Sequence, residues 1–341
     1  MIIDDIKITP LYNTARMLDV GDKEYHTRYF DYISNSRLSL INPEQGGTPE
    51  KFFGIMPQIY SDNILLGSAI HAVTLQRDKY FIAEPCDRPT AKLGFVCDEL
   101  YEDYRNGVEI SSHLINEAAR KIGYYISKPN QTLSQKRIDA IYEAGYPYWM
   151  KRKGLEYKYR KEGINKTPIY LSDKDRIKAN TCEFVFDQHL FGYLKSHDAL
   201  CSGNEKTFVM DCIITMPSGK EYTFKLKGKA DNYNITDDTI IVNDVKTVSD
   251  IGIFDVNVEK FRYMREMAMY CWLIGCASQP ADGNHTDYNY ESNFLVVSTR
   301  NDDWYIKPMT KKLFREGWKE LQYLLRLVAY YYDKGYRFEQ A

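Results

Sequence analysis

Two neighbouring segments in the middle of the chain constrain its fold most strongly. Residues 222–231 alternate as a β-strand does, and the β-branched run that begins at residue 239 predicts a second strand. If the turn between them is centred on Asp237 and Asp238, antiparallel pairing places Asp231 directly opposite Asp244. Side chains repeat every two residues along a strand, so Lys246 shares the face of Asp244. Two carboxylates and one amine are therefore expected to converge.

The composition fits a folded chain with a sizeable core. The 341 residues are 44% hydrophobic and 14% aromatic, which is ample for one large domain or two ordinary ones. A net charge of −2 excludes a uniformly basic coat for nucleic acid but not a local basic groove. The cysteines are scattered and lack a C-x-x-C pair, so neither a disulfide framework nor a zinc ribbon is indicated. The first residues do not resemble a signal peptide and no apolar run is long enough to cross a bilayer, so we expect a soluble, reduced, intracellular protein with no membrane partner.

The order of the predicted elements indicates a single α/β domain over residues 1–341. A mainly helical lead-in occupies residues 1–200 and carries His71, and a sheet core with a C-terminal helix occupies residues 201–341. Helices are expected at residues 34–40, 63–76, 111–127, 134–144, 172–197, 258–276 and 309–332, and further strands at residues 206–216 and 292–299. Ser172 and Asp175 resemble a capping box that begins one of these helices.

The paired acids of the hairpin have a specific chemical requirement. At about 4 Å and an effective dielectric constant near 20, two carboxylates repel each other by roughly 4 kcal/mol, so one is protonated or a cation lies between them. Oxygen ligands favour Mg²⁺ or Mn²⁺ over zinc. A lysine beside such a metal can orient a water and stabilise developing phosphate charge. The spacing alone fits equally well a surface cluster of salt bridges formed by Asp231, Asp244 and Lys246.

Basic residues suggest two candidate contacts with nucleic acid. Lys225, Lys227 and Lys229 share the face of Asp231 unless Gly228 forms a bulge, and they could meet phosphates or form a solvated face. Residues 149–178 are locally basic with interleaved aromatics, which fits either a surface that follows DNA or a solvated loop.

Two helices carry further polar residues that could serve the same site. His71 lies on a largely apolar predicted helix, where it could be a metal ligand or an ordinary core or capping histidine. Tyr263, Glu266 and Tyr270 form a polar stripe on the helix after the hairpin, and in isolation this is an ordinary amphipathic face with buried rings.

With these residues in place, the chain resembles the PD-(D/E)XK nuclease superfamily, and within it the RecE-like (exonuclease VIII-like) phage exonucleases of the RecB-related group. The ordered set covers most of residues 25–275. It comprises Tyr25 and His26 with residues 32–38, a G-x-x-x-H helix over residues 66–71, residues 81–85 and 88–90, the acidic position at Glu205, the core motifs at residues 227–231 and 243–247, and a helix over residues 263–270 where the family has Q-x-x-x-Y. The resemblance implies an α/β restriction-endonuclease-like core, a central mixed sheet flanked by helices, with N-terminal helical elaborations.

The resemblance also implies roles for individual residues. Asp231, Asp244, His71 and the carbonyl of Val245 would bind Mg²⁺, with Mn²⁺ as a substitute, and Lys246 would be the catalytic lysine. Glu205 would be an outer acid. Tyr270, Glu266, Lys229 and Lys227 would lie at the DNA. Glu266 departs from the family glutamine, which weakens that contact because a carboxylate repels phosphate. Some relatives carry an iron–sulfur cluster, but the cysteines of this chain lack the required C-terminal cluster, so we expect none.

The expected function is a metal-dependent exonuclease that degrades duplex DNA from its ends, 5′→3′, and leaves a 3′ single strand for recombination or repair. Expected partners are double-stranded DNA ends, a single-strand annealing protein and further copies in a homo-oligomeric ring, in the cytoplasm of a bacterial or phage-infected cell. A structure-selective endonuclease on the same core and a catalytically decayed DNA-binding protein remain alternatives.

Overall fold

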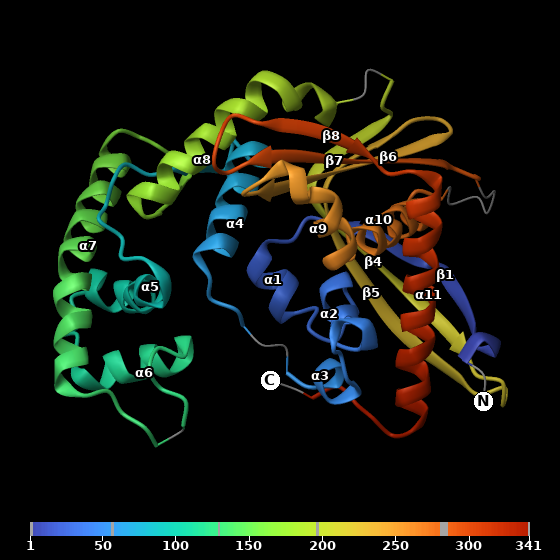
Figure 1. Ribbon diagram of the computed structural model, residues 1–341, viewed down its shortest axis with the longest axis horizontal. Helices are drawn as coiled ribbons and strands as arrows, with labels where there is room; N and C mark the ends of the chain where they lie inside the picture. Colours follow the sequence, from blue (N-terminus) through green and yellow to red (C-terminus); the bar gives the residue numbers. More distant parts are fainter. Residues whose placement is uncertain (1–2, 56–57, 129, 196–197, 280–285, 340–341) are drawn as a thin grey trace. The chain divides into compact units, whose positions relative to one another are not determined.

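The computed structural model describes residues 3–55, 58–128, 130–195, 198–279 and 286–339. The chain divides into two compact units (Figure 1). The first combines residues 1–57, 188–298 and 303–341, and the second comprises residues 58–187 and 299–302. Residues 7–18, which were expected in a mainly helical lead-in, form a strand of the sheet in the first unit.

The first unit contains a mixed six-stranded sheet in the order β1-β4-β5-β6-β7-β8. Its strands are β1 (Lys7–Leu18), β4 (Cys201–Thr215), β5 (Glu221–Ile235), β6 (Thr239–Val248), β7 (Asn289–Ser298) and β8 (Trp304–Pro308). Only the β6–β7 pair is parallel among these described strands. The predicted α/β class with a central mixed sheet is confirmed at this level. The edge strand β1 was not predicted, and its Pro10 is compatible with a strand because an edge has one unpaired side.

Helices in this unit pack against the sheet. The α-helices are α1 (Asp22–Thr27), α2 (Asn35–Ser39), α3 (Pro49–Phe53), α9 (Phe254–Lys260), α10 (Tyr263–Ala277) and α11 (Lys311–Asp333). The helix predicted over residues 258–276 is divided into α9 and α10 at Arg262, whose φ of +58° is left-handed. A right-handed helix cannot continue through that conformation.

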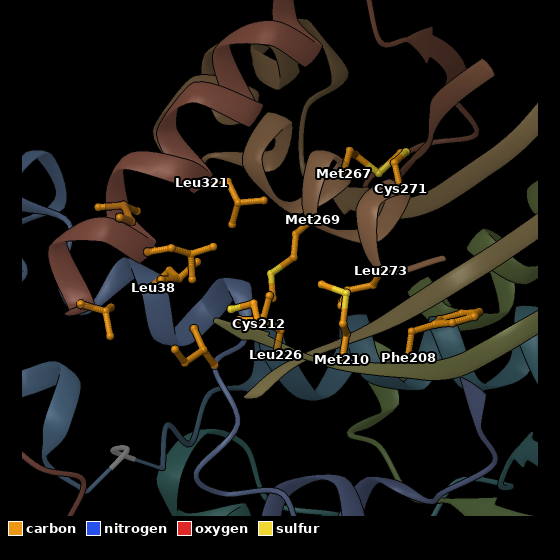
Figure 2. Close-up of a cluster of buried hydrophobic side chains, with 14 of the residues drawn as sticks. Leu38, Phe208, Met210, Cys212, Leu226, Met267, Met269, Cys271, Leu273 and Leu321 are labelled. Carbon is orange, nitrogen blue, oxygen red and sulfur yellow. The ribbon is translucent and has the colours of Figure 1, made fainter. Parts of the chain in front are cut away.

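The core of the first unit lies between α10 and the sheet (Figure 2). Met269 and Leu273 of α10 are buried in one cluster with Met210 of β4 and Leu226 of β5, and α11 packs against α10. Since α10 also contacts β5 and β6, this packing fixes its polar residues above those two strands.

The second unit is mainly helical. It contains α4 (Asp62–Leu75), β2 (Tyr80–Ile82), α5 (Ala91–Arg105), α6 (Ser112–Ile122), α7 (Gln135–Lys161), β3 (Thr167–Ile169) and α8 (Asp173–Val185). The Ser172 hydroxyl accepts a hydrogen bond from the Asp175 amide at 3.3 Å, so the N-cap of the predicted capping box is confirmed. No described helix of either unit has the length and apolar character needed to cross a membrane.

Three of the four aromatics interleaved in the basic segment 149–178 are buried and so cannot form the DNA-stacking surface considered from the sequence, whereas Tyr157 is 68% exposed. Residues 149–161 continue α7, and the side chains of Trp149, Tyr159 and Tyr170 are buried in the core of the second unit. A buried ring cannot stack on a base. The sequence pattern did not reveal this burial, because it results from the packing of α5 and α6 against α7.

Candidate active site

The hairpin has the register predicted from the sequence. Asn232 pairs with Asn243, and the next step along both strands places Asp231 opposite Asp244. Strand pairing ends there, and the Asp231 Oδ2 atom instead accepts a hydrogen bond from the amide of Val245 at 2.7 Å. The carboxylate therefore takes the place of a backbone acceptor where β5 and β6 separate. The role expected for the Val245 carbonyl stays a prediction.

Lys246 lies between two carboxylates. Its Nζ is 2.7 Å from Asp244 Oδ2 and 3.0 Å from Glu266 Oε2, and it lies 4.5 Å from the centroid of the Tyr263 ring. The side chain of Asp244 is 2% exposed and that of Lys246 is 15% exposed. The alternative of a surface salt-bridge cluster is therefore wrong, because the contacts are buried.

Burial governs the electrostatics of this cluster. Desolvation raises the pKa of Asp244 well above its ordinary value, and Asp231 and Glu266 add to the effect while Lys246 opposes it. Burial alone would lower the pKa of Lys246, but the surrounding carboxylates, led by Asp244 and Glu266, outweigh it and raise that pKa. Lys246 therefore remains an ammonium, and the acids around it outnumber it.

The donor set fits a hard divalent cation. Asp244 Oδ2 is buried and contacts Lys246, but no described residue satisfies it with good hydrogen-bond geometry. Glu205 lies beside this pair, because the β4–β5 register places it opposite Asp231. Carboxylate oxygens of Glu205 and Asp231 lie within 4.8 Å of each other. Carboxylate oxygens are the ligands that Mg²⁺ and Mn²⁺ prefer.

Glu205 and Lys229 form an ion pair in which both side chains are largely buried. Glu205 has a φ of +53°, which is an uncommon conformation for a residue with a side chain. Regular β4–β5 pairing is interrupted at Glu205 and resumes on both sides. The interruption lies in the cross-strand row that contains Glu205 and Asp231.

Lys227 does not fit the expected DNA contact. Its side chain is buried, its ammonium donates to the Tyr25 carbonyl at 2.8 Å, and it lies 4.1 Å from the centroid of the Tyr25 ring. The error in the sequence-based interpretation comes from the N-terminal segment, which covers this part of β5. Gly228 is not a bulge, since pairing with β4 is regular through it.

Tyr270 packs directly over Gly228. A Cβ at Gly228 would lie 2.9 Å from Tyr270 Cδ1, so only glycine permits this close approach. The Tyr270 hydroxyl donates to Glu266 Oε1 at 3.1 Å. Tyr270 thus holds Glu266 against Lys246. The sequence predicted that Glu266 and Tyr270 share one face of a helix, but not that this face contacts Lys246.

His71 lies on α4 in the second unit, where it is partly buried. Within that unit α4 packs against α8 and β2. The ligand role implied by the resemblance stays a prediction.

A row of asparagines was missed from the sequence. Hydrogen bonds of 2.8–3.0 Å connect Asn204, Asn232, Asn243 and Asn293, which occupy one cross-strand row on β4, β5, β6 and β7. Asn232 and Asn243 directly neighbour Asp231 and Asp244 in the chain. An amide both donates and accepts, so the row links four strands immediately beside the acids. The sequence signal that could have revealed this row is an asparagine next to each of the acids Glu205, Asp231 and Asp244.

Comparison with known proteins identifies no family. No family model matches the chain, and no curated protein matches it. Among solved structures, the crystal structure of SSO0001 is similar with a TM-score of 0.25 and 14% identity, over 50% of this chain and 69% of that chain. That similarity is too low to carry an argument about fold or function.

Proposed function

We propose that the protein is a metal-dependent DNA exonuclease that degrades duplex DNA from its ends, 5′→3′, and exposes a 3′ single strand for recombination or repair. The observation that carries the proposal is the buried cluster in which Asp231 and Asp244 share one cross-strand position and Lys246 contacts Asp244. The ordered sequence resemblance to the RecE-like nucleases supports the choice of reaction and substrate.

In this proposal each residue has a distinct task. Asp231, Asp244 and Glu205 supply the oxygen ligands for Mg²⁺ or Mn²⁺. A bound divalent ion would polarise the scissile phosphate and lower the pKa of the attacking water. The Lys246 ammonium, which the surrounding acids favour, can orient that water or stabilise negative charge that develops on the phosphate.

Glu266 would hold the lysine in place before DNA binds. Its carboxylate contacts Lys246 through one oxygen and accepts the Tyr270 hydroxyl on the other. Both contacts offset its negative charge, which reduces the repulsion of phosphate expected from a glutamate at this position.

Variants of the cluster test the proposal. Asp244→Ala and Lys246→Ala should each reduce Mg²⁺-dependent degradation of end-labelled linear duplex by about 10³-fold or more, since such groups contribute several kcal/mol of transition-state stabilisation. Asp237→Asn, an exposed acid in the turn of the same hairpin, is the matched control and should retain activity. Circular dichroism checks that the variants fold. Full activity in either cluster variant would rule out the site.

The same assay separates the alternatives. A covalently closed circular duplex should remain intact under conditions that degrade the linear form. Cleavage of the circle would favour a structure-selective endonuclease. Metal-independent DNA binding without cleavage of either substrate would favour a catalytically decayed binding protein.

A further inference from the structure

The helix α7 exposes a continuous face of large side chains. Tyr146 is 42% exposed, Met150 52% and Tyr157 68%, while Tyr148 on the opposite face and Trp149 at the edge of this face are fully buried in the second unit. The solvent-facing side of a long helix is usually dominated by polar side chains. Large apolar side chains gathered on one exposed face typically mark an interaction surface.

The exposed face has the spacing of a coiled-coil seam. Intervals alternate between three and four residues along its members, which are Glu143, Tyr146, Met150, Lys153, Tyr157 and Arg160. This 3.5-residue period keeps one stripe facing a partner helix along its whole length. We call these six residues the α7 seam.

Charge is distributed unequally along the seam. Its N-terminal end carries Glu143, preceded one turn earlier by exposed Asp139, and its C-terminal end carries Arg160, followed by exposed Lys161. The aromatic and apolar residues lie between these ends. A partner of uniform charge would be repelled at one end, whereas an identical seam in the opposite direction complements both ends.

We propose that the α7 seam pairs antiparallel with the α7 seam of a second copy of this chain. In the register that matches seam positions, Glu143 meets the partner's Arg160, Tyr146 meets the partner's Tyr157, and Met150 meets the partner's Lys153. Each pair occurs twice about a two-fold axis, so the interface is closed and gives a dimer. The inference depends on α7 alone and not on the proposed nuclease activity.

Local details of α7 are compatible with this approach. Gly154 lies beside the seam, and a Cβ built there would meet nothing within 4 Å. Because glycine has no side chain, a partner helix can approach closely at this point. Lys153 donates to the Arg105 carbonyl at 3.2 Å, which leaves its aliphatic stem available to cover a methionine. Tyr142 and Tyr146 stack with 5.8 Å between ring centroids, which extends the flat aromatic surface beside the seam.

DNA fits the seam less well than a second copy does. Tyrosines interleaved with basic residues can bind single strands, but the acidic end formed by Asp139 and Glu143 would repel phosphates. Parallel pairing with a second copy would place Glu143 on Glu143 and Arg160 on Arg160. Antiparallel pairing is the arrangement that brings opposite charges together at both ends of the seam.

A charge-reversal cycle on the full chain tests the proposal. Sedimentation equilibrium should find a dimer for the wild type. Glu143→Arg and Arg160→Glu should each weaken dimerisation about tenfold or more, because each creates two like-charge contacts per dimer. The double variant should restore dimerisation, since opposite charges then face each other again. Both positions are exposed, so the fold should be unaffected, and circular dichroism checks this.

Other outcomes would overturn the proposal. A monomeric wild type would eliminate the interface, and a double variant no better than the single ones would eliminate the antiparallel register. Glu117→Arg, an exposed charge reversal on α6, is the control and should leave the dimer unchanged. If Tyr157→Ala lost binding to a labelled single-stranded oligothymidine while its mass remained that of the wild type, the seam would be a nucleic-acid surface instead.

Discussion

At the scale of single residues, Glu266 is the clearest departure from the motif of the nuclease family that the sequence resembles. Its carboxylate lies 3.0 Å from Lys246 Nζ, close enough to compete with a phosphate for that ammonium. A glutamine would keep the hydrogen bond to Tyr270 and lose the charge. The identity of this one residue is therefore expected to tune DNA affinity more than fold.

Glu266→Gln should strengthen binding of duplex DNA about fivefold, which corresponds to roughly 1 kcal/mol of removed like-charge repulsion. The measurement is fluorescence anisotropy with Ca²⁺ in place of Mg²⁺, at two salt concentrations. Glu291→Gln, an exposed acid on β7, is the matched control. Weaker binding by Glu266→Gln would show that holding Lys246 matters more than removing the charge.

Lys227 gives a pH-dependent contribution to stability. Burial, with Arg37 nearby, lowers its pKa from 10.5 to about 8. Between these two values the unfolded chain holds the proton and the folded chain does not, so the free energy of unfolding rises with pH in that window. Below pH 8 both states are protonated and the cost of the buried charge is fully present.

Lys227→Met should therefore be more stable than the wild type near pH 7, and the difference should shrink as pH rises from 8 towards 10.5. The change across the window is on the order of 3 kcal/mol, because one pKa unit corresponds to about 1.36 kcal/mol. Urea denaturation at several pH values measures it. Lys225→Met, an exposed lysine on the same strand, should show no such trend. Parallel pH profiles for the wild type and Lys227→Met would contradict the assignment.

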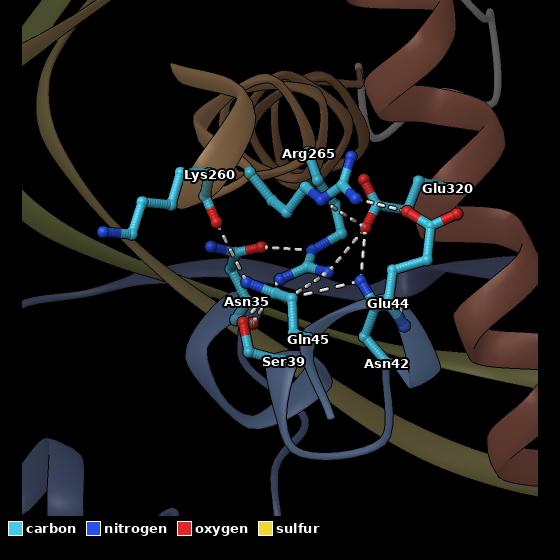
Figure 3. Close-up of polar contacts among 9 residues, drawn as sticks. Asn35, Ser39, Asn42, Glu44, Gln45, Lys260, Arg265 and Glu320 are labelled. Atoms are coloured by element: carbon cyan, nitrogen blue, oxygen red, sulfur yellow. Dashed lines mark hydrogen bonds and ion pairs between the residues drawn. The ribbon is translucent and has the colours of Figure 1, made fainter. Parts of the chain in front are cut away.

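At the scale of elements, a buried arginine joins α10 to its neighbours (Figure 3). The guanidinium of Arg265 is fully buried, donates to Asn35 Oδ1 and Ser39 Oγ at 2.7 Å each, and lies 3.0 Å from Glu320 Oε1. These contacts connect α10 to α2 and α11. Since Glu266 is the next residue, the same network fixes the turn of α10 that faces Lys246.

Arg265→Met should lower the free energy of unfolding by about 3 kcal/mol, because it removes the nearer of the two cations of partly buried Glu320, the other being Arg262 at 3.6 Å, together with the donors to Asn35 and Ser39. Chemical denaturation measures the change. Adding Glu320→Gln should recover part of the loss, since the buried carboxylate that lost its nearer cation is then neutral. Arg315→Met, an exposed arginine on α11, serves as the control and should change stability little. An equal loss in the single and double variants would mean that packing, not charge, dominates.

At the scale of the whole molecule, metal binding should be coupled to folding. The acids of the site come from β4, β5 and β6, so they are brought together only in the folded chain. A ligand that binds only the folded state stabilises it by about 2.7 kcal/mol at a hundredfold excess over its dissociation constant. Mn²⁺ should therefore raise the melting temperature of the wild type, and a chelator should reverse the effect.

Asp244→Asn should abolish this Mn²⁺-dependent shift, whereas Asp237→Asn should retain it. Differential scanning calorimetry with and without Mn²⁺ makes the comparison. The same calorimetric comparison on His71→Ala tests the ligand role implied by the sequence resemblance. The expected result is a smaller Mn²⁺-dependent rise in melting temperature than in the wild type. An undiminished shift in Asp244→Asn would remove Asp244 from the set of metal ligands.

The sequence by itself determined the features that depend on short-range rules. The register that places Asp231 opposite Asp244 follows from a strand period of two and the position of one turn. The start of α8 follows from a serine that can accept the Asp175 amide. Both outcomes require only residues that are close together in the chain.

Only the tertiary structure decided which side chains are buried and which distant groups meet. The edge strand β1 forms because β4 offers it a partner, and the N-terminal segment then covers Lys227. Trp149 is buried because α5 packs on α7, and Glu266 reaches Lys246 because α10 folds back over the hairpin. Burial and long-range ion pairs depend on segments far apart in the chain, whose approach is set by the free energy of the whole core rather than by any local pattern.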